Sequence, residues 1–370
     1  MLRVLSVFGT RPEAIKMAPV VKELEKYPEQ IESRVCITAQ HREMLDQVLD
    51  IFDIWPDVDL DLMQPGQSLP DLTARTLIEL SRVLENARPD VVLVQGDTTT
   101  VMVGALAAFY HQIPVGHVEA GLRTRDRYSP FPEEINRRIT DVLTSFYFAP
   151  TLTAANALQR EGVAEDDIYV TGNTVIDALL WAVRQPEPTE IVRVMSGLEA
   201  KRLVLVTAHR RENFGAPLEQ VCLGLRKLVR RNPDIAIVYP VHLNPNVQDP
   251  VNRFLGGEKR VHLINPLSYL SFAHLMNRAE IVLTDSGGIQ EEAPALGKPV
   301  LVMRRETERP EAIEAGTARL IGPDADAIVY ESEHLLHDEN AYHQMARAVS
   351  PYGDGHAAER IVRILLEHLS

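Results

Sequence analysis

The sequence is short of cysteines, of basic residues and of long apolar runs, and each shortage argues against a class of protein. Its 370 residues include two cysteines, Cys36 and Cys222, at a separation that matches neither a metal site nor a redox pair. They fit buried thiols in a reducing compartment. The 38 basic residues face 52 acidic ones, for a net charge of −14. Nucleic acid and anionic membrane are therefore not expected as partners.

No apolar run approaches the roughly 20 residues that are needed to span a bilayer. The N-terminus leads directly into a strand-like run, without the basic leader and apolar core of a signal peptide. We therefore expect a cytoplasmic protein. Hydrophobic and charged contents of 45% and 24% are typical of a globular chain, and the length allows two domains.

Short β-branched runs alternate with amphipathic stretches of helical length. In the first half we expect strands at residues 2–8, 33–38, 91–95, 114–118 and 146–149, and helices at 14–26, 43–52, 72–86 and 101–111. In the second half we expect strands at 203–208, 235–240, 261–264, 281–284 and 300–303. Near-continuous apolar strands separated by helices predict parallel sheets covered on both faces. The sequence thus predicts an α/β protein with two Rossmann-like domains, and residues 185–197 are the expected linker.

Ligands of open α/β sheets sit outside the carboxyl ends of the strands, so the loops there are the candidate sites. Each of five such loops carries a small residue beside an ionisable one, and they lie at residues 9–13, 95–98, 117–121, 208–212 and 285–288. A purely structural role could explain one or two such loops. Five of them, spread over both halves of the chain, favour a binding or catalytic role.

The turn Ser286-Gly287-Gly288 lies between an apolar strand and a helix. Its backbone N–H groups can point outward at the positive end of that helix, which suits a phosphate. Glu292, one turn on, could accept hydrogen bonds from a ribose diol. A nucleotide diphosphate is the hypothesis that follows; a plain reversal of the chain is the alternative.

Several other residues have a structural as well as a functional interpretation. Arg11 and Lys16 could meet phosphate oxygens or hold a closing domain, or they could be solvated surface charges. Asp97 could be a simple helix N-cap. His117 and Glu119 share one face of a strand, as a metal pair would, but no third ligand stands at a telling spacing.

Three carboxylates from neighbouring loops form a candidate catalytic group: Asp97, Glu119 and Glu133. Glu133 alone could instead be a partner of the helix dipole. Opposite them we expect donors from the second domain, namely His209, Ser286 and Arg309. This combination suits an anionic leaving group with proton transfer at the neighbouring atom.

Taken together, these loops resemble the non-hydrolysing UDP-N-acetylglucosamine 2-epimerases of bacteria. The resemblance rests on the turn at Ser286 and on motifs in order along nearly the whole chain, at residues 8–17, 38–47, 94–100, 116–124, 171–177, 209–215 and 350–355. It implies the glycosyltransferase type B arrangement, with two Rossmann-like domains facing across a cleft, at residues 1–184 and 185–354. Residues 355–370 would form a last helix that crosses back to the first domain.

The resemblance also implies a reaction: the reversible conversion of UDP-N-acetylglucosamine into UDP-N-acetylmannosamine, without nicotinamide, metal or other cofactor. It implies a homodimer that supplies a precursor of surface polysaccharides. Because the hydrogen on C2 of the sugar is not acidic, we expect the C1–O bond to UDP to break as that proton leaves, giving a 2-acetamidoglucal. The alternatives are a hydrolysing variant, a glycosyltransferase of the same fold and a non-catalytic sensor.

The resemblance assigns roles to individual residues. It places catalytic groups on Asp97, Glu119, Glu133 and His209, and substrate contacts on Arg11, Lys16, Asp97, Glu119, His209, Leu267, Phe272, Ser286, Gly287, Gly288, Glu292 and Arg309. Leu267 stands where related proteins have a glutamine near the uracil, so a backbone contact could replace that side chain. A second, activating nucleotide-sugar site would involve Gln40, His41, Gln67 and Glu134, although Gly66 stands where some relatives have arginine.

Overall fold

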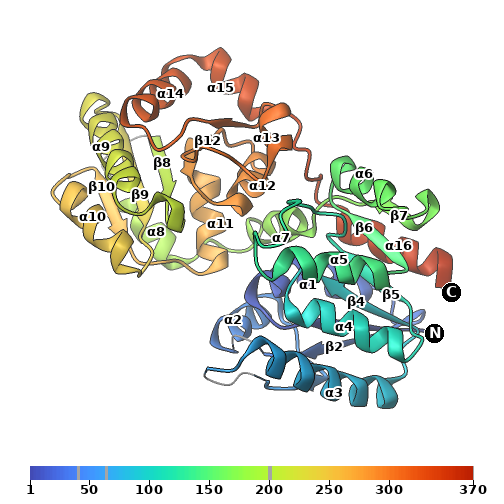
Figure 1. Cartoon of the computed structure of the whole chain (residues 1–370). Helices are drawn as coiled ribbons and strands as arrows, with labels where there is room; N and C mark the ends of the chain where they lie inside the picture. Colours follow the sequence, from blue (N-terminus) through green and yellow to red (C-terminus); the bar gives the residue numbers. More distant parts are fainter. Residues whose placement is uncertain (40–41, 63–65, 199–201, 370) are drawn as a thin grey trace. The chain divides into compact units, whose positions relative to one another are not determined.

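The computed structural model describes residues 1–39, 42–62, 66–198 and 202–369. Its contacts divide the chain into two compact units, of which the first comprises Met1–Ala178 and Tyr352–Ser370 and the second Leu179–Pro351. Each unit has its own parallel sheet, as Figure 1 shows. The α/β class expected from the sequence is confirmed. The domain boundary expected after residue 184 stays a prediction.

The first unit has seven strands among its described residues, in the order β3-β2-β1-β4-β5-β6-β7. They are β1 Leu2–Phe8, β2 Ile31–Ile37, β3 Val58–Asp59, β4 Val91–Gln95, β5 Val115–Val118, β6 Phe146–Ala149 and β7 Ile168–Val170. The helices are α1 Arg11–Leu24, α2 Arg42–Phe52, α3 Leu69–Ala87, α4 Thr99–Tyr110, α5 Glu133–Leu143, α6 Leu152–Arg160, α7 Thr174–Ala182, which continues into the second unit, and α16 Ala357–Leu369. Helix α16 packs on α1.

The second unit has six described strands, in the order β10-β9-β8-β11-β12-β13. They are β8 Arg202–Thr207, β9 Ile235–Pro240, β10 Val261–Ile264, β11 Ile281–Thr284, β12 Val300–Val302 and β13 Ala318–Leu320. Its helices are α8 Thr189–Ser196, α9 Ala216–Arg231, α10 Pro245–Leu255, α11 Tyr269–Arg278, α12 Gly287–Ala295, α13 Pro310–Glu314, α14 Ala325–His337 and α15 Glu339–Ala346. Among the described residues no helix is long and apolar enough to cross a bilayer.

The expected strands are confirmed where the apolar run is continuous. Six of them, at residues 2–8, 91–95, 146–149, 235–240, 261–264 and 281–284, match the structure residue for residue. All five residues of β4 are buried, as a strand covered on both faces requires. Strands β3, β7 and β13 were not expected, because runs of two or three residues carry too little pattern.

The linker interpretation of residues 185–197 was wrong for its central part. Thr189–Ser196 form helix α8, which contacts α11, and Ile191 is fully buried. The prolines that suggested a linker lie before the helix, and Pro188 is its N-cap residue. A short helix that begins after prolines resembles a linker in composition, and only its distant packing partner distinguishes the two.

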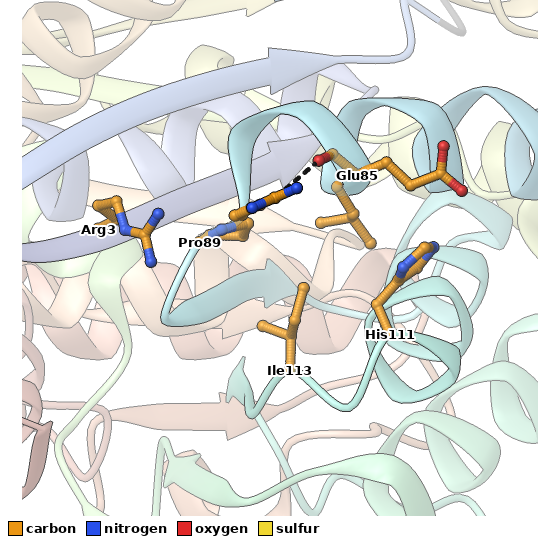
Figure 2. A pocket seen from close by; sticks show the side chains of 7 residues that line it. Arg3, Glu85, Pro89, His111 and Ile113 are labelled. Carbon is orange, nitrogen blue, oxygen red and sulfur yellow. Dashed lines mark hydrogen bonds between the residues drawn. The ribbon is translucent and has the colours of Figure 1, made fainter.

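An open hollow of about 490 Å³ lies on the first unit, at the edge where strands β1, β4 and β5 begin (Figure 2). Its lining includes Arg3, Arg88 and His111. Arg3 is paired with Asp90 at 2.8 Å, and Arg88 Nε donates to the Glu85 carbonyl at 3.4 Å. Since ligands of such sheets bind at the opposite edge, this hollow is not the candidate site.

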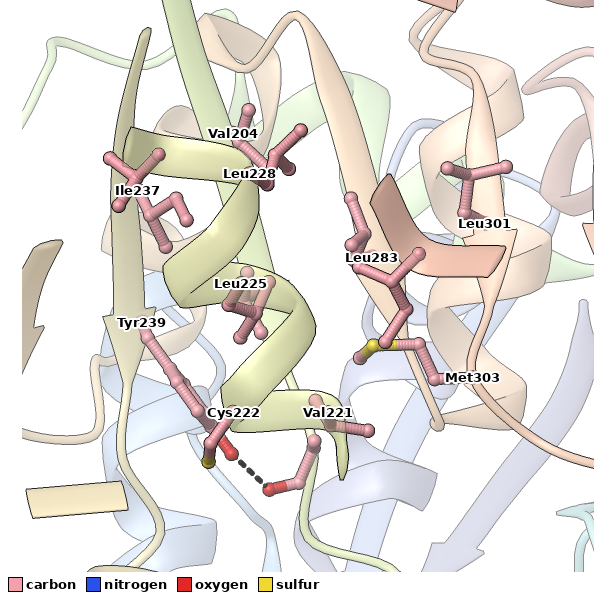
Figure 3. Close-up of a cluster of buried hydrophobic side chains, with 14 of the residues drawn as sticks. Val204, Val221, Cys222, Leu225, Leu228, Ile237, Tyr239, Leu283, Leu301 and Met303 are labelled. Carbon is pink, nitrogen blue, oxygen red and sulfur yellow. Dashed lines mark hydrogen bonds between the residues drawn. The ribbon is translucent and has the colours of Figure 1, made fainter. Parts of the chain in front are cut away.

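The core of the second unit extends to the start of one candidate loop (Figure 3). Tyr239, on β9, is fully buried in this cluster together with Val221, Cys222 and Leu225. Its hydroxyl donates to the Ala208 carbonyl at 2.6 Å. Because Ala208 directly precedes His209, this buried hydrogen bond links core packing to the loop after β8.

Replacing Tyr239 by Phe should destabilise the second unit by about 1–3 kcal/mol, because the buried Ala208 carbonyl loses its side-chain donor. Urea unfolding followed by circular dichroism measures the change. Tyr330→Phe is the matched control, since Tyr330 is 69% exposed and its change should stay within about 0.5 kcal/mol. Equal effects of the two substitutions would contradict the structural role of the Tyr239 hydroxyl.

Candidate functional site

In the first unit, the loop after β5 places Glu119 among three side-chain donors. Glu119 Oε1 lies 2.5 Å from Lys16 Nζ and accepts from Asn173 Nδ2 at 3.0 Å. Its Oε2 accepts from Gln95 Nε2 at 2.6 Å. The side chain is 6% exposed, and the backbone has a φ of +72°, which is uncommon outside glycine. These donors favour the ionised carboxylate and fix its direction.

The loop after β4 brings Asp97 to helix α5. Asp97 Oδ2 accepts from Arg137 Nη2 at 2.6 Å, and the Asp97 carbonyl accepts from Asn136 Nδ2 at 3.0 Å. Glu133 lies one turn earlier on the same helix, and its Oε2 is buried without a hydrogen-bond partner among the described residues. Gly96 lies close to Glu119: a side chain at position 96 would place its β-carbon 3.8 Å from Glu119 Oε2. Asp97 and Glu119 therefore occupy adjacent loops, and α5 carries Glu133 to the same region.

Arg11 and Lys16 are positioned by the tight start of helix α1. Thr10 and Glu13 form a capping box, in which Glu13 Oε2 accepts from Gly9 N at 2.8 Å and from Thr10 N at 2.7 Å. Thr98 also donates to Glu13, so the loops after β1 and β4 are tied together. Burial raises the pKa of Glu13 even though these hydrogen bonds act against the shift. Arg11 is half-buried directly after the capping residue.

The structure does not support His117 and Glu119 as a metal pair. Both ring nitrogens of His117 contact protein oxygens, at 2.6 Å from Asp141 Oδ1 and 2.8 Å from the Gly96 carbonyl. The imidazole therefore offers no lone pair to an ion. Within the described part of the chain, no group of three or more His, Cys, Asp or Glu could hold a metal.

In the second unit, helix α12 begins directly after the glycine-rich turn, as expected. Ser286 is its N-cap residue, but the Ser286 side chain makes no capping hydrogen bond. The Ser286 N–H is already engaged, donating to Thr284 Oγ1 at 2.9 Å. An ideal Cβ on Gly288 would lie 3.4 Å from Glu292 Oε1, so that carboxylate lies beside the turn. The first N–H groups of α12 thus lack a side-chain cap, which suits an anion.

Two guanidinium groups converge on this helix start. Both lie beside Gly287: a side chain at that position would place its β-carbon 3.6 Å from Arg210 Nη2 and 3.9 Å from Arg309 Cζ. Arg309 is ion-paired with Glu291. The Arg210 side chain has no carboxylate partner among the described residues. Sequence reasoning missed Arg210, although the run Arg210-Arg211 beside His209 was the available signal.

A buried carboxylate holds the loop that carries His209 and Arg210. Asp285 is fully buried, and its Oδ2 accepts from His209 N at 2.9 Å, Arg210 N at 2.8 Å and Asn213 Nδ2 at 3.1 Å. Asp285 Oδ1 has no hydrogen-bond partner in the described part of the chain and lies 3.9 Å from His209 Nδ1. Nothing in the local sequence identified Asp285 as an anchor, because its partners lie about 75 residues away.

His209 itself is 42% exposed at its side chain and stacks on His242, with ring centroids 5.4 Å apart. Partial burial lowers the pKa of His209, and His242 and Arg210 lower it further, while Asp285 acts in the opposite direction. The ring is therefore biased toward the neutral form near neutral pH. A neutral imidazole can donate or accept a hydrogen bond at one nitrogen without adding a fixed charge.

The remaining expected site residues lie apart from these clusters of contacts. Phe272 lies half-buried on α11, and Leu267 lies half-buried in the loop before that helix. Glu134 is 1% exposed and accepts from Thr124 N at 3.0 Å, and Gln67 is half-buried. Gln40 and His41 lie outside the described residues. The roles assigned to these residues by resemblance stay predictions.

Comparison with known proteins gives one consistent family. Residues 22–366 match the family model described as UDP-N-acetylglucosamine 2-epimerase. The UDP-N-acetylglucosamine 2-epimerase of Escherichia coli K12 is 58% identical over 372 residues, covering 98% of each chain. The Neisseria meningitidis structure bound to UDP-GlcNAc has a TM-score of 0.88 at 50% identity, covering 99% of this chain and 100% of that one.

A relative of lower sequence identity belongs to the same family. The Methanocaldococcus jannaschii UDP-GlcNAc 2-epimerase, in complex with UDP-GlcNAc and UDP, has a TM-score of 0.79 at 35% identity, covering 99% of this chain and 100% of that one. The family match spans strands, loops and helices of both units, including the loops that carry Glu119 and His209. By this match and by full-length identity above one half, the chain belongs to the UDP-N-acetylglucosamine 2-epimerase family.

Proposed function

We propose that this chain interconverts UDP-N-acetylglucosamine and UDP-N-acetylmannosamine without hydrolysing either. The proposal rests on one observation: this chain carries both a place for an anion and a group of held carboxylates. The second unit offers an uncapped helix start with Arg210 and Arg309 beside it. The first unit offers Glu119 and Asp97, each held by cationic and amide donors. Relatives that bind UDP-GlcNAc and UDP support the choice of ligand.

The chemistry requires both kinds of site. The hydrogen on C2 of the sugar has no adjacent carbonyl, so its direct removal near neutral pH is slow. When the C1–O bond to UDP breaks, positive charge develops at C1 and acidifies that hydrogen. Donors around the diphosphate stabilise the departing negative charge, and a carboxylate takes the proton. The products of this step are UDP and 2-acetamidoglucal; protonation of C2 on its other face, with return of UDP to C1, gives the epimer.

The carboxylates differ in their surroundings, which suits proton transfer on two faces. Glu119 contacts the ammonium group of Lys16, which favours its ionised form. Asp97 is bonded to the guanidinium of Arg137 and has a side chain that is 29% exposed. Glu133 has one buried oxygen without a hydrogen-bond partner among the described residues, so that oxygen is available to a substrate group. We infer that these three groups share the acid and base steps.

His209 and the α12 start would then hold the leaving group. A neutral imidazole can donate to a phosphate oxygen, and the Gly287 and Gly288 N–H groups add backbone donors. Arg309 and Arg210 supply positive charge, Glu292 lies where it can accept from the ribose, and Phe272 and Leu267 would contact the uracil. Arg11 would add a cation from the first unit.

The wider setting is proposed on the same basis. We infer a cytoplasmic homodimer that supplies an N-acetylmannosamine precursor for surface polysaccharide. Cys36 and Cys222 are both free and buried, which is compatible with a reducing compartment. Burial raises the pKa of each thiol to about 12, so neither is activated as a nucleophile. The full-length match to bacterial UDP-N-acetylglucosamine 2-epimerases supports the reaction that would make such a precursor.

Incubation of purified protein with UDP-N-acetylglucosamine in D2O tests the reaction. We expect UDP-N-acetylmannosamine carrying deuterium at C2, because the proton taken from C2 exchanges with solvent before another returns. Proton NMR follows the product and the loss of the C2 signal. Product that keeps only the original hydrogen would contradict exchange with solvent. Free N-acetylmannosamine with UDP would indicate a hydrolase, and binding without turnover a sensor.

Replacing Asp97, Glu119 or Glu133 by the corresponding amide should lower kcat by about two orders of magnitude or more, because each variant loses a group that transfers a proton. UDP binding, measured by calorimetry, should change little, since the proposed diphosphate donors lie in the second unit. Glu79→Gln is the matched control: Glu79 pairs with the surface residue Arg82, and its replacement should leave kcat unchanged. Normal turnover in all three site variants would overturn the assignment.

Replacing Arg210 by Gln should weaken UDP binding about tenfold or more, because a charge-assisted hydrogen bond contributes roughly 1.5–3 kcal/mol. Arg211→Gln is the matched control, since Arg211 is the exposed neighbour in the same segment and removes the same charge. Calorimetric titration with UDP at low and high salt compares the two. An equal loss in both variants would show a general effect of net charge rather than a contact of Arg210.

A further inference from the structure

His117 is buried between two hydrogen-bond acceptors, and the proposed reaction gives it no part. Its side chain is 0% exposed. Nδ1 lies 2.6 Å from Asp141 Oδ1, and Nε2 lies 2.8 Å from the Gly96 carbonyl. A carbonyl oxygen and a carboxylate can only accept, so each nitrogen must donate. Both ring nitrogens are thus engaged, one with the Asp141 carboxylate and the other with the backbone of Gly96.

The charge of Asp141 is itself secured by other groups. Arg123 Nη2 lies 2.7 Å from Asp141 Oδ2, and the Gly121 N–H donates to the same oxygen at 3.4 Å. Burial alone would raise the pKa of Asp141, but His117 and Arg123 outweigh it and the pKa is lowered. Arg123 also pairs with Glu161 at 2.7 Å. Asp141, which holds His117, is thus itself held by Arg123, and Arg123 is held in turn by Glu161.

The far end of this cluster reaches the proposed catalytic groups. Gly96 has a φ of +86° and lies between Gln95 and Asp97. The Gln95 side chain donates to Glu119 at 2.6 Å. His117 holds the Gly96 carbonyl, and it also lies two residues before Glu119 in the chain. The His117 ring therefore fixes the backbone of Gly96. Gly96 is preceded by Gln95, which orients Glu119, and is followed by Asp97.

We propose that His117 is a positioning residue for Asp97 and Glu119, and that it acts as a rigid bridge between Asp141 and the Gly96 carbonyl. It exchanges no proton with the substrate. Histidine suits this place because its two donors stand on opposite sides of one rigid ring. The amide of Gln or Asn carries both donors on one nitrogen, so it can keep one of the two bonds at most. The proposal rests on the proposed function of Asp97 and Glu119.

His117→Gln should lower kcat about tenfold or more, because a small displacement of Asp97 or Glu119 is costly for proton transfer. KM and the affinity for UDP should change less than about threefold, since the diphosphate donors lie in the second unit. His111→Gln is the control, as His111 lines the hollow at the opposite edge of the sheet. Unchanged kcat, or a loss confined to KM, would overturn the proposal.

The pH dependence of kcat separates positioning from proton transfer. His117→Gln should keep the shape of the wild-type profile at a lower level, because the titrating groups remain. Loss of one limb would make His117 a catalytic acid or base and overturn the positioning role. Asp141→Asn combined with His117→Gln should be little worse than the stronger single variant, since both break one network. Fully additive losses would contradict a shared network.

A spectroscopic test on the wild-type protein does not depend on whether these variants fold. Nitrogen NMR of wild-type protein with labelled histidine side chains should show both ring nitrogens of His117 engaged in hydrogen bonds. A His117 ring nitrogen that exchanges freely with solvent would overturn the bridge. If the wild-type protein makes no UDP-N-acetylmannosamine, the proposed function fails while this result still stands. If the epimerase is active but His117→Gln is equally active, only the positioning proposal fails.

Discussion

All the strands of each sheet run parallel, and this constraint decides where chemistry can take place in each unit. A parallel pair needs a crossover, so each strand delivers its following loop to the same edge of the sheet. In the first unit that edge collects the segments of Thr10, Asp97 and Glu119. In the second it collects His209 and the turn at Ser286. Residues separated by about 80 to 100 positions thereby meet without any local signal.

Buried carboxylates anchor the loops at these edges. Glu13 accepts from the backbone of the β1 loop and from Thr98, while Asp285 accepts from the backbone of the β8 loop. Asp141 holds His117 and Arg123. A buried carboxylate is costly unless donors surround it, and here the donors are the loops themselves. These hydrogen bonds restrain the loops, and donors held in fixed positions are the condition for electrostatic stabilisation without reorganisation.

The sequence predicted those features that depend only on residues close together in the chain. Continuous apolar runs such as residues 91–95 gave strand limits to the residue, and the turn at Ser286 predicted a strand, a turn and a helix start that the structure contains. Helix α8 resembled a linker, because its packing partner is distant. Arg210, Asp285 and the two contacts of His117 were missed for the same reason: their meaning depends on partners from other strands. Family resemblance supplied residue roles, but it gave no indication of which groups anchor them.

The two edges also differ in how their charges are balanced. Glu119 and Asp97 each contact a cation, Lys16 or Arg137, whereas Arg210 has no carboxylate among the described residues. An uncompensated cation beside an uncapped helix start favours an anion that arrives from outside, as a departing diphosphate does. The carboxylates of the first unit instead have fixed directions, because cationic and amide donors hold them. Under the proposed elimination, this difference assigns anion stabilisation to the second unit and proton transfer to the first.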